Sequence, residues 1–330
     1  MKKKAIIISA VALAVILVFV LVFKKDSFDK KVENLMNDMN SYKLQGDMDI
    51  TKGEDVKKYA IEVGYKKVKK EDYFRVSITD KELNQTQVIL RNKNGVYVLT
   101  PTLNQIFKFE GDWPLNSLKP YLIQSIYEIL NGEDCNVEKQ KGQYLASSKV
   151  NYPNNVNFKK QEMIFDEDAK IKNLKIKDDS DALQLQIKFN KVDYEAKLKD
   201  SYFALPDKLE SQVSAPVVDD AQLPLYPMNV YDSVLNSSKT LEVINGVRHV
   251  LEYQGDKNFT VIESIKNKSD ELETVIMPGE FVDSIDAFGF FDGNHMQMIK
   301  DGVEYTIYSD ELTPEEMAEV LNSMQVVVMK

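Results

Sequence analysis

The chain has very few of the residues that build catalytic and metal sites. Its 330 residues include one cysteine, Cys135, and two histidines, His249 and His295. A single cysteine cannot form an internal disulfide or supply a thiol metal cluster. The sequence also lacks a G-x-S-x-G, a G-x-G-x-x-G and a Walker loop, so the common hydrolase, dinucleotide and nucleotide sites are not indicated. We therefore expect no catalytic residues, no metal and no cofactor, and we predict that the chain is not an enzyme.

Arginine is scarce as well, and basic charge is missing from one half of the chain. Only Arg75, Arg91 and Arg248 are arginine among 42 basic residues. Residues 26–216 carry 30 basic and 31 acidic residues, whereas residues 217–330 carry 7 basic and 21 acidic residues, a net charge of −14. An acidic half of this size repels phosphate, so a nucleic-acid partner is not expected. It could face a basic protein surface, although acidic surfaces more often serve solubility alone.

A long apolar run occurs only near the N-terminus. Lysines at positions 2–4 precede nineteen residues, Ala5–Phe23, in which only Ser9 is polar, and two lysines follow. At about 1.5 Å per residue this run makes a helix of about 28 Å, long enough to cross a hydrocarbon core. No small-x-small cleavage site and no lipobox cysteine follow it. The pattern favours an uncleaved signal-anchor over residues 1–25, in the cell membrane with a single pass and with the rest outside the cytoplasm. A cleaved signal peptide is the alternative.

Residues 26–209 read as one domain made mostly of sequential antiparallel strands. Two amphipathic helices are expected within it, at 28–39 and at about 117–131, where Gly132 ends the second. A sheet this long must curl or close, so we predict one curved sheet wrapped around the helices. The alternation of apolar and polar residues predicts strands at 42–50, 59–65, 73–79, 86–91, 96–100, 106–109, 143–150, 161–166, 171–177 and 183–192.

The last third of the chain reads as a second, smaller unit. Residues 210–227 are rich in proline and aspartate and are predicted to be a linker. Residues 228–330 are predicted to form a small acidic α+β domain. Thr313 and Glu316 form a capping box with Pro314 at the first helical position, so a helix is expected to begin there. Its strands are expected at 240–243, 248–253, 259–266, 295–300 and 303–309.

Several short motifs in residues 28–210 follow the order found in a known family. Leu90–Asn92, Val98–Pro101, Phe107–Phe109 and Asp112–Pro114 resemble the YdcC-type sporulation proteins of spore-forming Gram-positive bacteria. Those proteins are similar to the outer-membrane lipoprotein carrier (LolA) superfamily. The resemblance implies an α+β fold with an incomplete antiparallel β-barrel, in which helices form a lid over an apolar cavity. The two-domain arrangement also resembles periplasmic regulators that bind an anti-sigma factor.

The resemblance also implies candidate binding residues. The LolA family uses an arginine on an early strand to hold the lid helices through their carbonyls, and Arg75 is the best positional match, with Arg91 the weaker one. Alternatively, Arg75 lies on the outer face with Tyr73 and Ser77. An apolar cavity would be lined by Phe74, Val76, Ile78, Trp113, Tyr121, Leu122 and Ile126. The alternative is that these seven side chains pack against one another as a core, as apolar residues at such spacings usually do.

Three functions are open at this point. The first is a membrane-tethered, non-enzymatic binding protein that takes up a lipid or acyl group or an apolar protein segment during sporulation or germination. The second is a protein–protein adaptor with a filled barrel, which regulates a cell-wall enzyme or an anti-sigma-type signalling partner. The third is a lipoprotein or lipid carrier. A carrier diffuses between membranes, whereas this chain is predicted to be tethered, so transport does not come with the fold alone.

Overall fold

The structure is a computed structural model, and it describes residues 28–53, 55–114, 118–152, 155–210, 222–244 and 246–325. The predicted anchor at residues 1–25 lies outside the described residues. So does most of the predicted linker, of which only residues 210 and 222–227 are described. Within the described part of the chain, no helix has both the length and the apolar character needed to cross a membrane.

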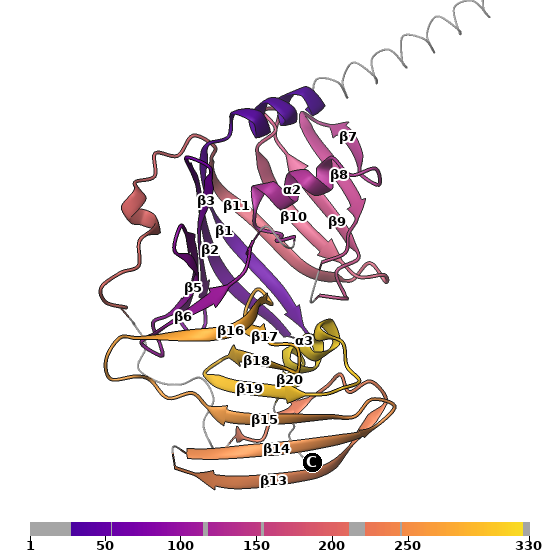
Figure 1. The fold of residues 1–330 in the computed structure, drawn as a ribbon. Helices are drawn as coiled ribbons and strands as arrows, with labels where there is room; N and C mark the ends of the chain where they lie inside the picture. Colours follow the sequence, from indigo (N-terminus) through magenta and orange to yellow (C-terminus); the bar gives the residue numbers. More distant parts are fainter. Residues whose placement is uncertain are drawn as a thin grey trace, which may run out of the picture.

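The N-terminal two thirds form an open antiparallel sheet, which we call the half-barrel. Six strands follow one another from β1 (Ser41–Lys52) to β6 (Gln105–Glu110), and β11 (Leu183–Asp193) returns to pair with β1. The strand order is β7-β8-β9-β10-β11-β1-β2-β3-β4-β5-β6. The sheet curves around helix α2 (Ile123–Leu130), as Figure 1 shows. The other strands are β2 (Asp55–Val68), β3 (Glu71–Asp80), β4 (Gln85–Asn92), β5 (Gly95–Thr100), β7 (Asn136–Gln140), β8 (Gln143–Lys149), β9 (Lys160–Phe165) and β10 (Ile171–Lys177).

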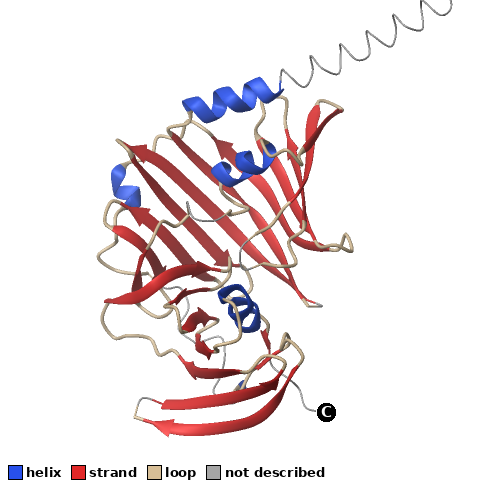
Figure 2. Ribbon diagram, turned by 45° about the vertical axis from the view of Figure 1, so that its right-hand side comes forward, coloured by secondary structure: helices blue, strands red, loops and turns tan. Residues whose placement is uncertain are grey.

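Two helices lie on the concave side of the half-barrel. Residues 28–38 are helical and cross one end of the sheet, while α2 lies against its concave face (Figure 2). Phe28 is fully buried and stacks on Tyr144 at a ring distance of 4.2 Å. Ile126 and Tyr127 of α2 are also fully buried. The prediction of a mainly antiparallel, open sheet with helices on one side is confirmed, although α2 is shorter than the predicted helix at 117–131.

The second unit is an antiparallel sheet with one helix. Its strand order is β13-β14-β15-β19-β18-β17-β16, and α3 (Pro314–Asn322) packs on β18 and β19. The predicted capping box is confirmed, because the Thr313 hydroxyl accepts from the Glu316 N–H and the Glu316 carboxylate accepts from the Thr313 N–H. The strands are β12 (Tyr226–Pro227), β13 (Ser233–Val243), β14 (Gly246–Gly255), β15 (Phe259–Ile265), β16 (Glu273–Asp283), β17 (Phe288–Phe291), β18 (His295–Lys300), β19 (Val303–Tyr308) and β20 (Met324–Gln325), which pairs with β12.

Strand β16 joins the two units. It pairs in parallel with β6, the last strand of the half-barrel, so that all strands except β12 and β20 belong to one continuous 18-stranded sheet. Phe281 and Phe288 belong to the hydrophobic core of the half-barrel, whereas Leu251, Val261 and Tyr305 belong to a separate core inside the second unit. Strands β7, β12, β16, β17 and β20 are absent from the sequence-based prediction. The domain boundaries at 209 and 228 stay a prediction.

A short segment covers the outer face of the half-barrel. The 3-10 helix η1 (Asp200–Phe203) follows β11 and lies on β3 and β4. Phe203 is 1% exposed and packs in a small outer cluster with Leu90 and Leu99. The ring of Tyr202 lies so close to Gly64 of β2 that a Cβ atom there would be 2.5 Å from a ring carbon. Glycine at this position is therefore what lets η1 pack flat on the sheet.

Candidate functional site

The seven side chains predicted to line an apolar cavity all lie together inside the half-barrel. Each is at most 4% exposed, and all seven belong to one continuous hydrophobic core. They are Phe74, Val76, Ile78, Trp113, Tyr121, Leu122 and Ile126. In this structure they pack against one another, against α2 and against side chains of the second unit. A role of these residues in ligand binding stays a prediction.

Aromatic side chains of the second unit enter this core. The ring of Phe281 lies 4.5 Å from Phe109 and 6.0 Å from Trp113, measured between ring centroids. Phe288 lies 5.1 Å from Phe107. Such offset and edge-to-face contacts are worth about 0.5–1.5 kcal/mol each beyond the burial of apolar area. The concave face of the half-barrel is thus occupied by a segment that lies outside the half-barrel itself.

A buried carboxylate lies at the centre of this contact. Asp283, the last residue of β16, has a fully buried side chain. One of its oxygens accepts from the Trp113 indole N–H at 3.1 Å and from the Tyr121 hydroxyl at 2.8 Å. The other oxygen accepts from the backbone N–H of Ile285 at 2.9 Å. The Lys119 ammonium, 6% exposed, lies 3.6 Å from the same carboxylate.

Burial dominates the electrostatics of the groups around Asp283. It lowers the pKa of Lys119, because the ammonium is desolvated, and the nearby carboxylate only partly offsets this. Burial also raises the pKa of Tyr121, and the negative charge of Asp283 adds to the effect. Tyr121 therefore remains a neutral hydroxyl that donates to the carboxylate. The arrangement thus holds the Asp283 carboxylate between a neutral hydroxyl, an indole N–H and the Lys119 side chain.

The two arginines of the half-barrel lie on opposite faces of the sheet. Arg75 of β3 is paired with Leu90 on the outer face, where its guanidinium carbon lies 5.5 Å from the centre of the Tyr202 ring. Arg75 therefore has the outer-face position that the sequence analysis gave as the alternative, away from the helix at residues 28–38 and from α2. Arg91 of β4 is paired with Phe74 on the concave side and donates to the backbone carbonyl of Trp113 at 3.1 Å. Of these two arginines, Arg91 thus bonds a carbonyl in the segment leading to α2.

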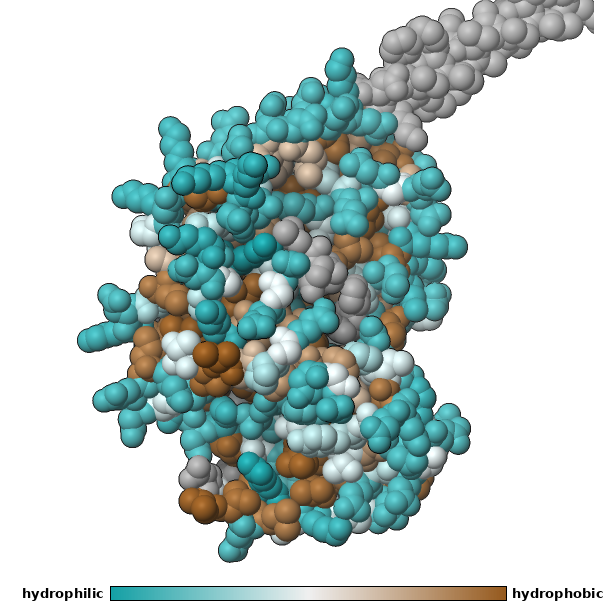
Figure 3. Space-filling view, in the orientation of Figure 1, coloured by the Kyte–Doolittle hydropathy of each residue, from teal (hydrophilic) through white to brown (hydrophobic). Residues whose placement is uncertain are grey.

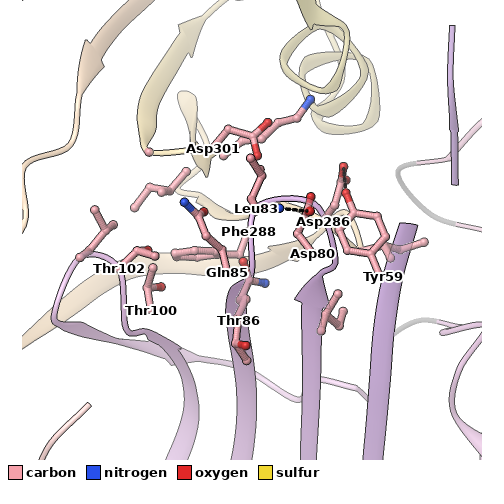
Figure 4. Close-up of a pocket in the computed structure, with 17 residues that line it drawn as sticks. Tyr59, Asp80, Leu83, Gln85, Thr86, Thr100, Thr102, Asp286, Phe288 and Asp301 are labelled. Carbon is pink, nitrogen blue, oxygen red and sulfur yellow. Dashed lines mark hydrogen bonds between the residues drawn. The ribbon is translucent and has the colours of Figure 1, made fainter. Parts of the chain in front are cut away.

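A small polar cavity lies where the strand ends of the half-barrel meet the second unit. Its volume is about 80 Å³, room for about two or three water molecules. Threonines 86, 100 and 102 line it from one side, and Asp286, Phe288 and Asp301 from the other (Figure 4). The Thr100 hydroxyl is buried without a hydrogen-bond partner among the described residues, which fits a site for ordered water.

Charges beside this cavity hold the two units together. Lys52 lies 3.2 Å from Asp286, and Lys57 lies 3.0 Å from Asp301. Burial alone would raise the pKa of Asp286, but the ammonium groups of Lys52, Lys300 and Lys57 outweigh it and lower this pKa to about 2. Burial lowers the pKa of Lys300 to about 8. Pairs of this kind fix the relative position of the units more than they stabilise the fold.

A larger cavity of about 360 Å³ lies between the end of β1 and helix α3. Ile50 and Lys52 line it on the half-barrel side, and Glu319 and Asn322 on the other. Of the seven predicted residues, Ile78 lines the small polar cavity and none lines this larger one. The described residues include no group of three or more histidine, cysteine, aspartate or glutamate side chains that could hold a metal ion.

The sequence analysis did not single out Asp283, Lys119 or Arg91 as parts of one interior site. Residues two apart on a strand share a face, so Phe281 could have pointed to Asp283 only if β16 had been predicted as a strand, and it was not. Lys119 carried no signal of this kind, because it lies in a non-repetitive segment before α2.

In the surface view most of the visible face is hydrophilic, and brown apolar side chains gather near the level where the two units meet (Figure 3).

Comparisons with known proteins give the family of the chain. No family model matches it. The chain is 31% identical over 295 residues to the sporulation protein YdcC of Bacillus subtilis (strain 168), and the match covers 86% of each chain. This chain belongs to the YdcC family. The family predicted from the motifs of residues 28–210 is thereby confirmed.

Solved structures resemble this YdcC-family chain only distantly. The Pseudomonas aeruginosa MucA/MucB complex contains a chain that is 12% identical, with a TM-score of 0.35, covering 92% of this chain and 100% of that one. The LolA superfamily protein NE2245 of Nitrosomonas europaea is 11% identical, with a TM-score of 0.25, covering 87% and 93%. Scores this low carry no argument about function, which has to come from the site itself.

Proposed function

We propose that this chain is a membrane-tethered, non-enzymatic binding protein of the cell envelope that acts in spore formation. Three observations support the proposal. The apolar run Ala5–Phe23 has the length of a membrane anchor. A relative over most of the chain is named as a sporulation protein. The interior of the half-barrel presents apolar side chains and hydrogen-bond donors that suit binding.

The proposed binding surface is the edge of β6 that β16 covers in this structure, together with the concave face beside it. The observation that supports this choice is that β16 already binds at the edge of β6 within the same chain. It adds to β6 as a parallel strand from Gln105 to Glu110 and buries Phe281 in the half-barrel core. Strand addition of this kind is a general way to bind extended peptides, with backbone hydrogen bonds for affinity and side-chain pockets for specificity. A protein segment is therefore the ligand that the geometry supports best.

An acyl chain is the second candidate ligand. All seven side chains predicted for the cavity are apolar or aromatic, and such a surface would accept a lipid or a lipoprotein acyl group if the second unit moved away. This reading needs the core around Ile126 to open. The protein-segment reading needs only that β16 leave the edge of β6.

Site-specific cross-linking in sporulating cells tests the proposal. A photoreactive phenylalanine analogue replaces Lys108 on β6, or Lys188 on the outer side of β11 as a matched control; both side chains are at least partly exposed. We expect a protein adduct at position 108 and none at 188, in the membrane fraction. Lys108 lies over Tyr97 on the outer face of β6, so this position reports on a strand added at the edge and not on an acyl chain in the core. Adducts at neither position, or equally at both, would contradict binding at the β6 edge.

A further inference from the structure

We propose that Trp113, Lys119 and Tyr121 form a carboxylate-binding pocket for an acidic side chain of a partner protein, and that Asp283 occupies this pocket within the chain. The inference rests on the proposed function, since it names the chemistry of the segment that the half-barrel would bind. Nothing in the motifs of the sequence indicates such a pocket.

The donors and the acceptor of this contact come from different units. The three donor side chains all lie in the short connection between β6 and α2, within the half-barrel. Their acceptor, Asp283, ends β16 of the second unit. The three side-chain donors thus all belong to the half-barrel, whereas the Ile285 N–H, which binds the other oxygen, belongs to the second unit and would leave together with Asp283. An incoming segment could take the place of Asp283 at the three side-chain donors.

The chemistry of the donors restricts what can replace Asp283. An indole N–H and an ammonium group donate hydrogen bonds and accept none. Trp113 is 1% exposed and Lys119 is 5% exposed, so water has little access to either. If Asp283 moved away, Lys119 would either stay a buried cation without a facing carboxylate or lose its proton, since burial already lowers its pKa, and either change costs free energy unless another anion takes the place of Asp283. The pocket therefore selects a negatively charged acceptor.

The surrounding contacts indicate an extended protein segment with a defined pattern. Phe281 lies two residues before Asp283, and a strand places such a pair on the same face. The ring of Phe281 lies against Phe109 and Trp113 while Asp283 reaches the donors. A partner that adds to β6 in the same register would carry an aromatic residue two positions before an aspartate or glutamate. It would bind only when β16 leaves β6, so the second unit competes with the partner.

Peptide binding to the full-length chain tests the inference. Two fluorescein-labelled peptides have the sequence of residues 273–286, which includes the part of β16 that pairs with β6, one unchanged and one with Asp283→Asn. The protein is the wild-type chain or its Asp283→Asn variant, which removes the competing carboxylate. Fluorescence anisotropy should show that the variant binds the unchanged peptide about tenfold more tightly than the Asn peptide. It should also bind the unchanged peptide about tenfold more tightly than the wild-type chain does. Equal affinity of the variant for both peptides would overturn the inference.

A second variant separates the role of the charge from that of the fold. Lys119→Met in the Asp283→Asn background removes the buried cation but keeps a long apolar stem. We expect this double variant to bind both peptides equally, because the preference for the carboxylate is lost. A preserved preference would contradict the assignment of Lys119 to the pocket.

A measurement on the wild-type chain covers the case in which the variants do not fold. Trp113 is the only tryptophan, so 5-fluorotryptophan labelling gives one ¹⁹F signal from the pocket itself. Millimolar unchanged peptide should produce a second signal that the Asn peptide does not produce, and identical spectra with both peptides would count against the pocket. If both peptides bind and cross-link equally at position 108, only the carboxylate pocket is wrong. If no segment reaches position 108, the proposed function itself fails.

Discussion

Two carboxyl groups of the second unit are fully buried, in opposite chemical surroundings. Asp283 accepts hydrogen bonds from Trp113, Tyr121 and the Ile285 backbone. Glu263 of β15 is 0% exposed and accepts one hydrogen bond, from the Leu225 N–H at 3.2 Å, and its other oxygen has no partner among the described residues. Burial raises the pKa of Glu263 to about 8, although the Leu225 N–H acts in the opposite direction. The folded protein therefore holds this carboxyl neutral at pH 7.

The first prediction concerns the pH dependence that follows from Glu263. The folded state keeps the proton up to about pH 8, whereas the unfolded chain releases it near pH 4.5. Between these values the unfolded state binds fewer protons, so the free energy of unfolding falls as the pH rises. Glu263→Gln should remove this pH dependence. At pH 8.5 its free energy of unfolding should exceed that of the wild type by about 2–4 kcal/mol, since one pKa unit corresponds to about 1.4 kcal/mol. Urea unfolding at pH 5.5, 7 and 8.5 measures both curves.

Glu242→Gln is the matched control for this prediction. Glu242 lies on β13 of the same unit and its side chain is exposed. This variant should keep the pH dependence of the wild type. Parallel curves for Glu263→Gln and the wild type would show that Glu263 is ionised in the folded protein.

The second prediction compares the two arginines of the half-barrel. Arg91→Leu removes the hydrogen bond to the Trp113 carbonyl, so hydrogen exchange should become faster in residues 112–130, by about tenfold for a loss of about 1.4 kcal/mol. Arg75→Leu should leave α2 unchanged and speed exchange near Tyr202, which its guanidinium covers. Mass spectrometry of exchanged peptides distinguishes the two regions. Faster exchange in α2 with Arg75→Leu would restore the role that the family resemblance implies for Arg75.

At the scale of elements, much of the half-barrel could be predicted because each strand carries its own signal. The hairpin of β4 and β5 pairs Asn92 with Gly95, and residues 92–95, Asn-Lys-Asn-Gly, are a local turn signal between the two predicted strands. Strand β16 could not be predicted in the same way. Pro278 and Gly279 interrupt it, and its register shifts between Ile276 and Glu280. Proline and glycine disfavour a strand, so β16 forms because it pairs with β6, which is distant in the sequence.

The candidate functional site could likewise be predicted only where a residue carries a local sequence signal. Alternation along β4 places Arg91 on the face of the buried Ile89, so its concave position was available from the sequence, although a hairpin turn begins at the next residue. The contact between Asp283 and Trp113 joins residues 170 positions apart. A single sequence contains no signal for such a pairing.

The third prediction concerns η1 on the outer face of the sheet. Gly64→Ala places a Cβ atom 2.5 Å from the Tyr202 ring, so the ring must move and its hydrogen bond to Glu62, 2.8 Å long, is lost. We expect a loss of about 1–3 kcal/mol in the free energy of unfolding. The same change in a Tyr202→Ala background should cost much less, because the clash is gone. Denaturant unfolding of all four chains gives the coupling, and purely additive effects would show that the ring does not lie on Gly64.

At the scale of the whole molecule, two hydrophobic cores are linked through a few aromatic side chains. The core of the half-barrel includes Phe281 and Phe288 from the second unit. The second core lies under α3 and contains none of the half-barrel residues. Because Trp113 lies at the link and is the only tryptophan, its fluorescence reports on the contact between the two units. Far-UV circular dichroism reports on the strands of both units.

The last prediction compares the unfolding followed by Trp113 fluorescence with the unfolding followed by far-UV circular dichroism. In the wild-type chain the two signals should change together in denaturant, because the shared core couples the units. Phe281→Ala removes a ring that is 6% exposed and contacts Phe109 and Trp113, which should cost about 3–5 kcal/mol. The fluorescence change should then occur at lower denaturant than part of the dichroism change, since the second core survives. Ile276→Ala on the same strand, where the side chain is 73% exposed, should shift neither signal. If Phe281→Ala moved both signals equally, the two units would unfold as one body without need of this link, and release of β16 from β6 would not be a separate step.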